Sequence, residues 1–344
     1  MKSDAFLGSA NTLAIPASAK WLVEAACVED IRVANRFAQE NKMRALPLGE
    51  GSNIVFSGDY LGVVIHNTLL GRSVIEEDES SVLIEVAGGE NWHQLVTTCL
   101  QQGWYGLENL ALIPGTVGAA PIQNIGAYGV ELADVFDSLN YLAINDPAQA
   151  TDLVRLDKQQ CEFGYRDSVF KHRLRDNACV TSVRLRLSKQ PVPNASYPAL
   201  TQWLKEHELQ AVPKTLYQAV CSLRRSKLPD PKRIPNAGSF FKNPVISLAA
   251  CDAIQKGFAD IPCYDAGEGH KKLAAGWMIE KAGWRGRDCD STGMHRDQAL
   301  VLVNPAKAKG EQVLRVANAV ADSVHAMFNI RLEIEPRIYP RVNP

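Results

Sequence analysis

Apolar residues recur along the chain at two spacings, one typical of helices and one of strands. A helix is predicted from Glu29 to Gln39 and another from Trp92 to about Gln101, with Gly103 as its stop. Further helices are predicted around 273–282 and from about 310 to 328. The inward faces of the first two helices are predicted to hold Ile31, Ala34, Phe37, Ala38, Trp92, Leu95, Val96 and Cys99.

Shorter apolar runs predict strands. Val183, Leu185 and Leu187 alternate with arginines, which is typical of a half-buried strand, and the closing segment Ile330–Glu335 alternates in the same way. Residues 188–196 contain two prolines and few apolar residues, which predicts a loop. The remaining predicted strands are 45–48, 54–56, 63–65, 82–86 and 299–303. Because strands and helices mix without a regular βαβ rhythm, an α+β fold is favoured over a doubly wound sheet.

Length and composition narrow the class of protein. At about 150 residues per domain, 344 residues indicate two or three domains, and basic residues and prolines cluster near a predicted boundary at 224–231. The 37 basic and 38 acidic residues give a net charge of −1, which argues against a nucleic-acid binder. No apolar run approaches the roughly 20 residues of a membrane span, and the start lacks the apolar core of a signal peptide. We therefore expect a cytoplasmic protein without a membrane partner.

The eight cysteines are scattered. None forms Cys-x-x-Cys, and no His-Glu-x-x-His is present. In a cytoplasmic protein, scattered cysteines are usually small buried residues, so we expect neither a metal site nor a disulfide.

The first loop of chemical interest is Gly49–Asn53. It starts like Gly-x-Gly-x-x-Gly, but residue 54 is isoleucine and a strand follows, so the helix that a Rossmann fingerprint needs is missing. What remains is a tight turn between strands whose glycines leave backbone N–H groups bare, a concavity suited to phosphate. Taken alone, the pattern favours a plain hairpin turn.

The second loop, Pro114–Gly129, holds four glycines and two prolines in sixteen residues and no charged side chain. Because solvated loops are usually polar, this loop is expected to lie against something flat and uncharged. An isoalloxazine ring fits that description. A buried crossover between sheets fits it equally well.

Five motifs follow one another along the chain: Gly49–Asn53, Gly115–Gly129, Phe163–Ser168, Asn236–Pro244 and Leu332–Glu335. In this order they resemble the UDP-N-acetylenolpyruvoylglucosamine reductase family, flavoenzymes that complete UDP-N-acetylmuramate in peptidoglycan synthesis. The resemblance extends from about Asn11 to Arg337, and the insert around Tyr197 resembles the form with an extra substrate-covering loop. Asn11-Thr-Leu-Ala-Ile15 departs from the family's usual Asn-Thr-Phe-Gly-Ile.

The resemblance implies an α+β fold with a two-part FAD-binding region of the vanillyl-alcohol-oxidase type. Residues 1–68 with 337–344 would form the first part, 69–222 the second, and 223–336 a substrate-binding domain. It also implies NADPH as reductant. Because no histidine or cysteine matches a covalent attachment point, we expect FAD to be bound non-covalently, and we expect a monomer. Because the chain offers no second dinucleotide motif, we expect NADPH and the UDP-sugar to share one site.

Site residues follow from the resemblance where each motif is present. Ser239 matches the proton donor, and Arg166 and Glu335 match the pair that stabilises the enolate. Tyr197, Lys227, Asn243 and Gln298 match positions that contact the diphosphate or close over it. The matching flavin-binding residues are Gly49, Glu50, Gly51, Ser52, Asn53, Pro114, Gly115, Thr116, Gly118, Ala119, Gln123, Asn124, Ile125, Gly126, Ala127 and Tyr128.

The chemistry independently requires these residue types. Hydride addition to C3 of an enol ether leaves charge at C2, which the neighbouring carboxylate must take up. A guanidinium such as that of Arg166 offers fixed donors to those oxygens, and a protonated Glu335 can donate to them as well. Because the C2 carbanion is a strong base, the hydroxyl of Ser239 is acid enough to protonate it.

Two other functions remain open from sequence. A flavin oxidase of the same fold would use O₂ and an alcohol, but leaves Arg166, Ser239 and Glu335 unexplained. A non-catalytic regulator that binds flavin or a nucleotide sugar predicts that these three positions are broken, yet all three are intact.

Overall fold

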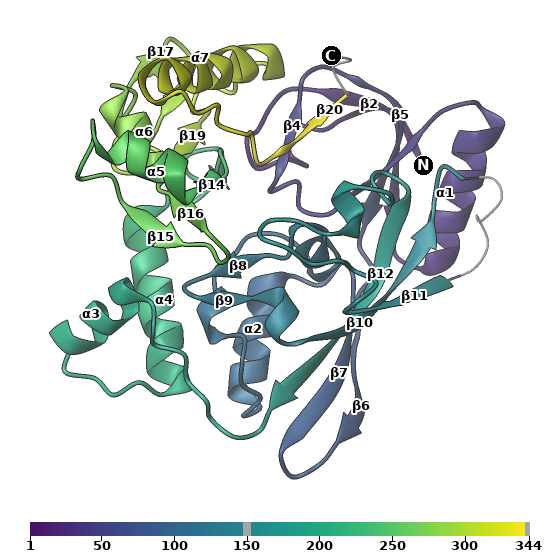
Figure 1. Cartoon of the computed structure of the whole chain (residues 1–344). Helices are drawn as coiled ribbons and strands as arrows, with labels where there is room; N and C mark the ends of the chain where they lie inside the picture. Colours follow the sequence, from purple (N-terminus) through teal and green to yellow (C-terminus); the bar gives the residue numbers. More distant parts are fainter. Residues whose placement is uncertain (147–152, 341–344) are drawn as a thin grey trace. The chain divides into compact units, whose positions relative to one another are not determined.

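The computed structural model of the chain describes residues 1–146 and 153–340, and the parts of the expected domains at 147–152 and 341–344 lie outside the described residues (Figure 1). The chain forms two compact units. Unit 1 comprises Met1–Ala5, Ala19–Glu50 and Leu61–Ser226, and unit 2 comprises Phe6–Ser18, Gly51–Tyr60 and Lys227–Pro344. The mixed, mostly antiparallel sheets confirm the α+β class. The division of the flavin region at residue 68 stays a prediction.

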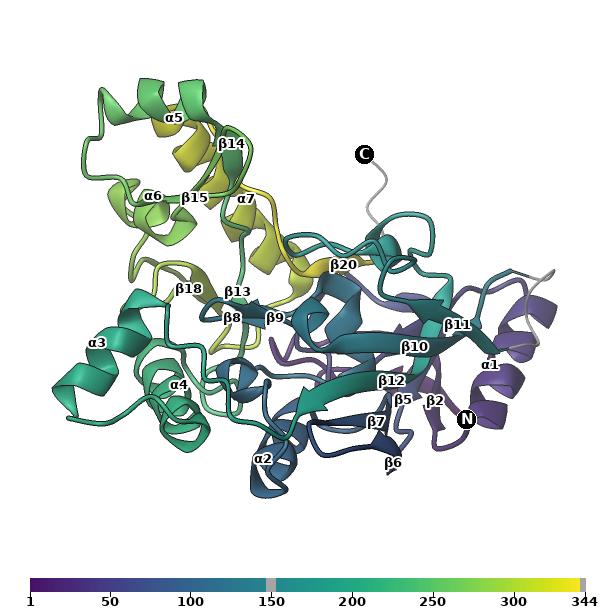
Figure 2. The ribbon, with the colours of Figure 1, turned by 60° about the horizontal axis from the view of Figure 1, so that its bottom comes forward.

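Unit 1 is built on two sheets. The four-stranded sheet has the order β1-β2-β5-β3, and the five-stranded sheet has the order β11-β10-β12-β7-β6, whose central strands lie side by side in Figure 2. The strands are β1 (Lys2–Phe6), β2 (Ser18–Ala25), β3 (Ala45–Leu48), β5 (Tyr60–Asn67), β6 (Arg72–Glu77), β7 (Ser81–Ala87), β10 (Phe136–Ala143), β11 (Leu153–Asp157) and β12 (Ala178–Ser188), with a small hairpin of β8 (Gly126–Ala127) and β9 (Val130–Glu131).

The helices of unit 1 bury the faces that their apolar spacing predicts. Helix α1 (Val28–Glu40) packs Ile31, Ala34 and Ala38 into a core with Val63 and Ile65 of β5. The other helices of this unit are α2 (Trp92–Gln101), α3 (Pro198–Glu206) and α4 (Pro213–Lys227), with short 3₁₀ turns η1 (Glu108–Leu110), η2 (Val117–Gln123), η3 (Leu132–Asp134) and η4 (Val169–Lys171).

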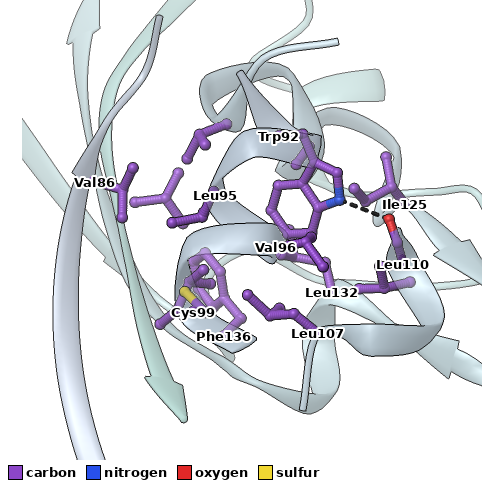
Figure 3. Close-up of a cluster of buried hydrophobic side chains, with 14 of the residues drawn as sticks. Val86, Trp92, Leu95, Val96, Cys99, Leu107, Leu110, Ile125, Leu132 and Phe136 are labelled. Atoms are coloured by element: carbon purple, nitrogen blue, oxygen red, sulfur yellow. Dashed lines mark hydrogen bonds between the residues drawn. The ribbon is translucent and has the colours of Figure 1, made fainter. Parts of the chain in front are cut away.

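Helix α2 anchors the larger core of unit 1. Asn91 caps its N-terminus, because Oδ1 accepts the Gln94 N–H at 2.9 Å. Trp92, Leu95, Val96 and Cys99 are buried as predicted, and Trp92 Nε1 donates to Leu110 O at 3.0 Å (Figure 3). The helix ends at Gln101, and Gly103 follows with φ +74°, which confirms the predicted stop. This core holds the segment around Leu110 that leads into the second glycine loop.

Unit 2 contains three small sheets. Their orders are β13-β19-β18-β17, β14-β16-β15 and β20-β4, the last a parallel pair. The elements are β4 (Ile54–Phe56), β13 (Asn236–Ser239), β14 (Val245–Ser247), α5 (Leu248–Gln255), β15 (Cys263–Asp265), β16 (His270–Leu273), α6 (Ala275–Lys281), β17 (Asp288–Cys289), β18 (Thr292–Met294), β19 (Val301–Val303), α7 (Gly310–Phe328) and β20 (Arg337–Tyr339). The helices predicted around 273–282 and 310–328 are thus confirmed.

Two strand predictions are wrong. Strands β3 and β4 do not form the hairpin that the Gly49–Asn53 turn favoured, because β3 pairs in parallel with β5 and β4 pairs in parallel with β20. Residues Ile330–Glu335 are not a strand either, and their only isolated bridge joins Ile334 to Phe241. Pro336 has no N–H to continue that ladder, so the strand begins one residue later, as β20.

Among the described residues no helix is long and apolar enough to cross a membrane. In the same residues no group of three or more His, Cys, Asp or Glu could hold a metal ion. All eight cysteines are free thiols, and burial raises the pKa of Cys99, Cys161 and Cys179 to about 12.

The backbone at Ala14 gives a stability prediction. Ala14 has φ +51°, a left-handed conformation that costs an L-residue about 1–2 kcal/mol and a glycine almost nothing. We therefore expect Ala14→Gly to raise the free energy of unfolding by about 0.5–1 kcal/mol, after the greater chain entropy of glycine is subtracted. The control is Ala319→Gly within α7, which should lower it by about 1 kcal/mol. A lower thermal midpoint for Ala14→Gly would contradict the assignment of strain.

Candidate active site

The first glycine loop is fixed by the carboxylate of Glu50. In unit 1, Glu50 Oε1 accepts from Asn91 Nδ2 at 2.6 Å, and Oε2 accepts from the Gly115 N–H at 3.0 Å. Gly49 lies against the second loop, since a Cβ placed there would be 2.6 Å from Thr116 Oγ1. The two loops that the sequence singled out separately are therefore in direct contact, and a side chain at position 49 would require Thr116 to move.

The second loop is a structured segment. Its 3₁₀ turn η2 packs into the core of unit 1, with Val117 and Ala120 buried. Gly118 donates to Gly88 O at 2.8 Å, and a Cβ on Gly118 would be 2.9 Å from the same oxygen. Packing against the sheet thus accounts for part of the apolar composition, as the crossover interpretation expected. The half-buried side chains of the loop, and backbone N–H groups that the core does not use, remain for contact with a ligand.

A pyrophosphate fits the junction of the two loops. Along residues 1–146 and 153–340, the structure records no acceptor for the backbone N–H groups of Gly49, Glu50 and Thr116. Bare amides at a glycine turn form an anion-binding concavity. The donor set at this junction therefore suits the pyrophosphate of a flavin dinucleotide, with the apolar turn beside it for the ring.

Several predicted flavin residues support the loop from behind. Asn124, with φ +43°, is buried, and its Nδ2 donates to Glu131 Oε2 at 2.6 Å and to Gly164 O at 3.2 Å. Ile125 belongs to the core, whereas Ala119, Gln123, Gly126, Ala127 and Tyr128 are half-buried and Pro114 is exposed. The buried side chains of Asn124 and Ile125 position the loop, whereas the half-buried and exposed residues of the loop are accessible.

The last residues of the first loop belong to unit 2. Gly51 has φ +62°, and its carbonyl oxygen accepts the Thr12 N–H at 3.1 Å. A Cβ on Gly51 would be 2.1 Å from Ala10 O, so no other residue fits there. Ser52 and Asn53 are half-buried, and Asn53 O accepts the Arg337 N–H at 3.0 Å.

Arg166 is held rigidly beside the second loop. Its Nη2 donates to Gly126 O at 2.7 Å, its carbonyl accepts from Lys171 Nζ at 2.7 Å, and its guanidinium carbon lies 5.4 Å from the centre of the Tyr165 ring. Its φ of +53° is unusual for an arginine. Backbone strain of this kind concentrates at functional sites, where surrounding contacts maintain it. The resemblance motif Phe163–Ser168 is thereby fixed to the glycine loop.

Tyr197 lies against the end of the same loop. Its ring meets that of Tyr128 edge-on, with centroids 5.3 Å apart, and Tyr197 is 42% exposed. Asn109 Nδ2 joins the two segments by donating to Tyr128 O and to Asn194 O, both at 2.9 Å. The ring of Tyr197 is thus exposed beside the end of the second loop.

In unit 2, Ser239 and Glu335 lie on neighbouring stretches of backbone. Ser239 ends β13, is exposed, and pairs with Val301 of β19. The next residue, Phe240, accepts the Glu335 N–H at 2.9 Å through its carbonyl oxygen. The half-buried Glu335 is thus fixed one residue away from the serine by main-chain bonds, even though the strand predicted for it does not form.

Two of the predicted diphosphate residues meet at the start of α6. Asn243 Oδ1 accepts the Ala275 N–H at 3.0 Å, which leaves Nδ2 as the donor available to a ligand. Gln298 Oε1 would be 3.4 Å from a Cβ on Gly276, so its amide lies against the same turn. Lys227 ends α4 and is exposed.

Sequence reasoning missed two residues of unit 1. Asn91 holds Glu50 while capping α2, and an asparagine just before a helix gives only the capping signal. Arg224 was noted only as one of the basic residues near the predicted boundary at 224–231, but it lies within α4 and its Nε is buried without a partner. The pKa of His93 is lowered by burial and, to a smaller extent, by the positive charges of Arg225 and Arg224. His93 Nδ1 accepts the Leu112 N–H at 3.1 Å.

Two regions of the sequence match known protein families, and several curated proteins are similar over most of the chain. Residues 19–148 match the FAD binding domain family, and residues 230–339 match the C-terminal domain of UDP-N-acetylenolpyruvoylglucosamine reductase. The UDP-N-acetylenolpyruvoylglucosamine reductase of Burkholderia cenocepacia (strain HI2424) is 44% identical over 333 residues, covering 96% of this chain and 94% of that protein. The reductase of Paraburkholderia xenovorans (strain LB400) is 48% identical over 294 residues, covering 85% and 84%.

Structure comparison agrees on the fold. The UDP-N-acetylenolpyruvylglucosamine reductase of Thermus caldophilus superposes with a TM-score of 0.65 at 23% sequence identity, over 98% of each chain. At that identity the match establishes the fold, which confirms an FAD-binding region followed by a reductase-type C-terminal domain. Because the identity to the curated relatives extends over nearly the whole chain, this protein belongs to the UDP-N-acetylenolpyruvoylglucosamine reductase family.

Proposed function

We propose that this chain reduces the enolpyruvyl group of UDP-N-acetylglucosamine enolpyruvate to give UDP-N-acetylmuramate, with NADPH as the electron source. The observation that carries the proposal is the contact between the two glycine loops, made through Glu50, Asn91 and Gly115. It leaves an amide-lined concavity for FAD, and Arg166 is fixed to the far end of the same loop. Bound FAD, reduced by NADPH, supplies the hydride for C3 of the substrate.

Ser239 is the proposed proton donor to C2. It is exposed at the end of β13, where its backbone pairs with Val301 of β19. A hydroxyl is a weak acid, but protonation of a carbanion depends on position more than on acidity. The neighbouring Gly238, with φ +70°, sets the backbone direction immediately before the serine.

Arg166 and Glu335 are the proposed stabilisers of the charge that develops on the substrate carboxylate. Arg166 Nη2 donates to the Gly126 carbonyl, which fixes the position of the guanidinium beside the second loop. Donors fixed in advance stabilise a developing oxyanion without reorganisation during the reaction. Glu335 is anchored through its own N–H to Phe240 O, so its carboxyl is carried on a defined backbone.

NADPH and the UDP-sugar are proposed to use one site in turn. Both are nucleoside diphosphates with a reactive group at the far end, and the Nδ2 donor of Asn243 with the Gln298 amide at α6 suits either diphosphate. Lys227 and Tyr197 complete this proposed set. The three-part domain division, the non-covalent attachment of FAD, the monomeric state and the cytoplasmic location stay predictions.

Replacing Ser239 tests the proton donor. Ser239→Ala should leave FAD binding and flavin reduction by NADPH unchanged while slowing flavin reoxidation by the UDP-sugar about 10²–10⁴-fold, the usual cost of losing a positioned acid. Stopped-flow absorbance separates the two half-reactions. Ser239→Cys, which keeps an acidic hydrogen at the position, should recover part of the rate. Reoxidation of Ser239→Ala at the parent rate would exclude this serine as the donor.

A double substitution tests the carboxylate-stabilising pair. Arg166→Gln and Glu335→Gln should each slow reoxidation about 10²–10³-fold, and the double variant should lose less than the product of the two factors. Arg173→Gln is the control, because Arg173 is an exposed arginine of the same segment. Strictly multiplicative losses would mean that the two residues act independently.

Steady-state kinetics test the shared site. When both substrates are varied at low concentration, initial rates should give parallel double-reciprocal lines, and excess UDP-sugar should inhibit competitively against NADPH. Intersecting lines, or a complex that holds both nucleotides at once, would contradict successive use of one site.

A further inference from the structure

The first turn of helix α2 holds the segment that leads into the second glycine loop. Trp92 Nε1 donates to Leu110 O at 3.0 Å (Figure 3), and the Trp92 N–H donates to Gly115 O at 3.0 Å. The neighbouring side chain on the helix adds a further link, since His93 Nδ1 accepts the Leu112 N–H at 3.1 Å. Two consecutive residues of one helical turn therefore fix the path of the chain from residue 110 to residue 115.

The link through His93 acts at an unfavourable backbone position. Leu112 has φ +57°, in the left-handed region that an L-residue rarely adopts, and such a conformation persists only where surrounding contacts maintain it. Three residues later the Gly115 N–H donates to Glu50 Oε2 at 3.0 Å, which joins the two glycine loops. Release of the Leu112 N–H would therefore loosen the junction at which the pyrophosphate of FAD fits.

The orientation of the His93 ring is itself fixed. The ring of Tyr217 on α4 stacks on it, with centroids 5.9 Å apart and planes 9° from parallel. Thr97 Oγ1 lies 3.0 Å from the Tyr217 hydroxyl and donates to His93 O at 3.0 Å. These contacts from α2 and α4 keep Nδ1 directed at the Leu112 N–H.

The hydrogen bond to Leu112 requires a neutral imidazole. Nδ1 can accept only when the ring proton is on Nε2, whereas a protonated ring would turn a second donor toward the Leu112 N–H. The positive end of the α2 dipole disfavours a charged ring at this position. Burial, then the positive charges of Arg225 and Arg224 on α4, lower the pKa of His93. Residues 110–115 carry no titratable side chain that could offset these effects.

We propose that His93 is a positioning residue for the flavin-binding loop and that FAD is held tightly only while its imidazole is neutral. The FAD-bound form keeps the proton off Nδ1, so acid favours release of FAD. A histidine whose pKa is lowered in the native state contributes its full stabilisation above the ordinary value of 6.5 and loses it as the pH falls below that value. The inference concerns cofactor binding and goes beyond the proposed reaction.

The test is the dissociation constant of FAD, measured from the holoenzyme by the fluorescence of released flavin at about pH 8 and about pH 5.5. For the parent protein, acidification should weaken binding about tenfold, the value of one hydrogen bond whose buried donor is left unsatisfied. His93→Asn places a side-chain oxygen near the position of Nδ1 that cannot be protonated in this range. Its affinity for FAD should therefore change less than about twofold between the two pH values.

A second variant separates the hydrogen bond from the ring stack. His93→Phe keeps a ring for Tyr217 but has no acceptor, so it should bind FAD about tenfold more weakly than the parent at about pH 8 and show little further loss in acid. His207→Asn is the matched control, because His207 is an exposed histidine of unit 1 at the end of α3. It should keep the pH dependence of the parent.

Hydrogen exchange of the Leu112 amide gives a readout that needs neither turnover nor bound FAD. Its protection factor, with the intrinsic exchange rate at each pH divided out, should fall on acidification in the parent and in His207→Asn, and stay constant in His93→Asn. This measurement also tests the inference if His93→Phe does not fold.

An equal loss of FAD affinity in acid for the parent and His93→Asn would overturn the inference, as would a parent whose affinity does not change. FAD binding by His93→Phe at the parent affinity would show that the link to Leu112 is not needed. Because none of these measurements uses the UDP-sugar, such results leave the proposed reaction standing. Failure of the holoenzyme to reduce UDP-N-acetylglucosamine enolpyruvate at about pH 8 would instead contradict the proposed function alone.

Discussion

The carboxylate of Glu50 is the contact on which the flavin site of this protein depends. It bridges the Asn91 side chain and the Gly115 backbone, so it joins a turn after β3 to a turn before η2. Each turn alone is a glycine-containing connection of ordinary kind. Joined, they bring the amides of Gly49, Glu50 and Thr116 to one place, and the absence of a side chain on Gly49 permits that approach.

The same loop connects the cofactor region to the catalytic chemistry. From η2 onward the chain is fixed to the Phe163–Ser168 motif at three points, through Asn124 Nδ2, Ser168 Oγ and Arg166 Nη2. A guanidinium with a strained backbone is therefore positioned by the segment that would contact the flavin.

The sequence predicted local features well and long-range pairings poorly. Helices α2 and α7 were predicted within a residue because each has a clear apolar face and a definite end, as at Gly103 and Asn329. The prediction of a hairpin at Gly49–Asn53 was wrong because β3 pairs with β5 and β4 pairs with β20, and β20 comes from the far end of the chain. No spacing along the sequence shows such partners. The contact between Gly49 and Thr116 and the hydrogen bond between Asn91 and Glu50 also join residues that lie far apart in the sequence, so local patterns could not predict them.

One assay tests the central claim most directly: anaerobic oxidation of NADPH by the purified yellow protein, followed by absorbance at 340 nm and by identification of the product. The account predicts that oxidation requires UDP-N-acetylglucosamine enolpyruvate and that one UDP-N-acetylmuramate forms for each NADPH consumed. In a parallel assay with O₂ admitted and the UDP-sugar omitted, turnover that needs O₂ would identify an oxidase. Bound flavin without turnover under either condition would identify a binding protein and contradict the account.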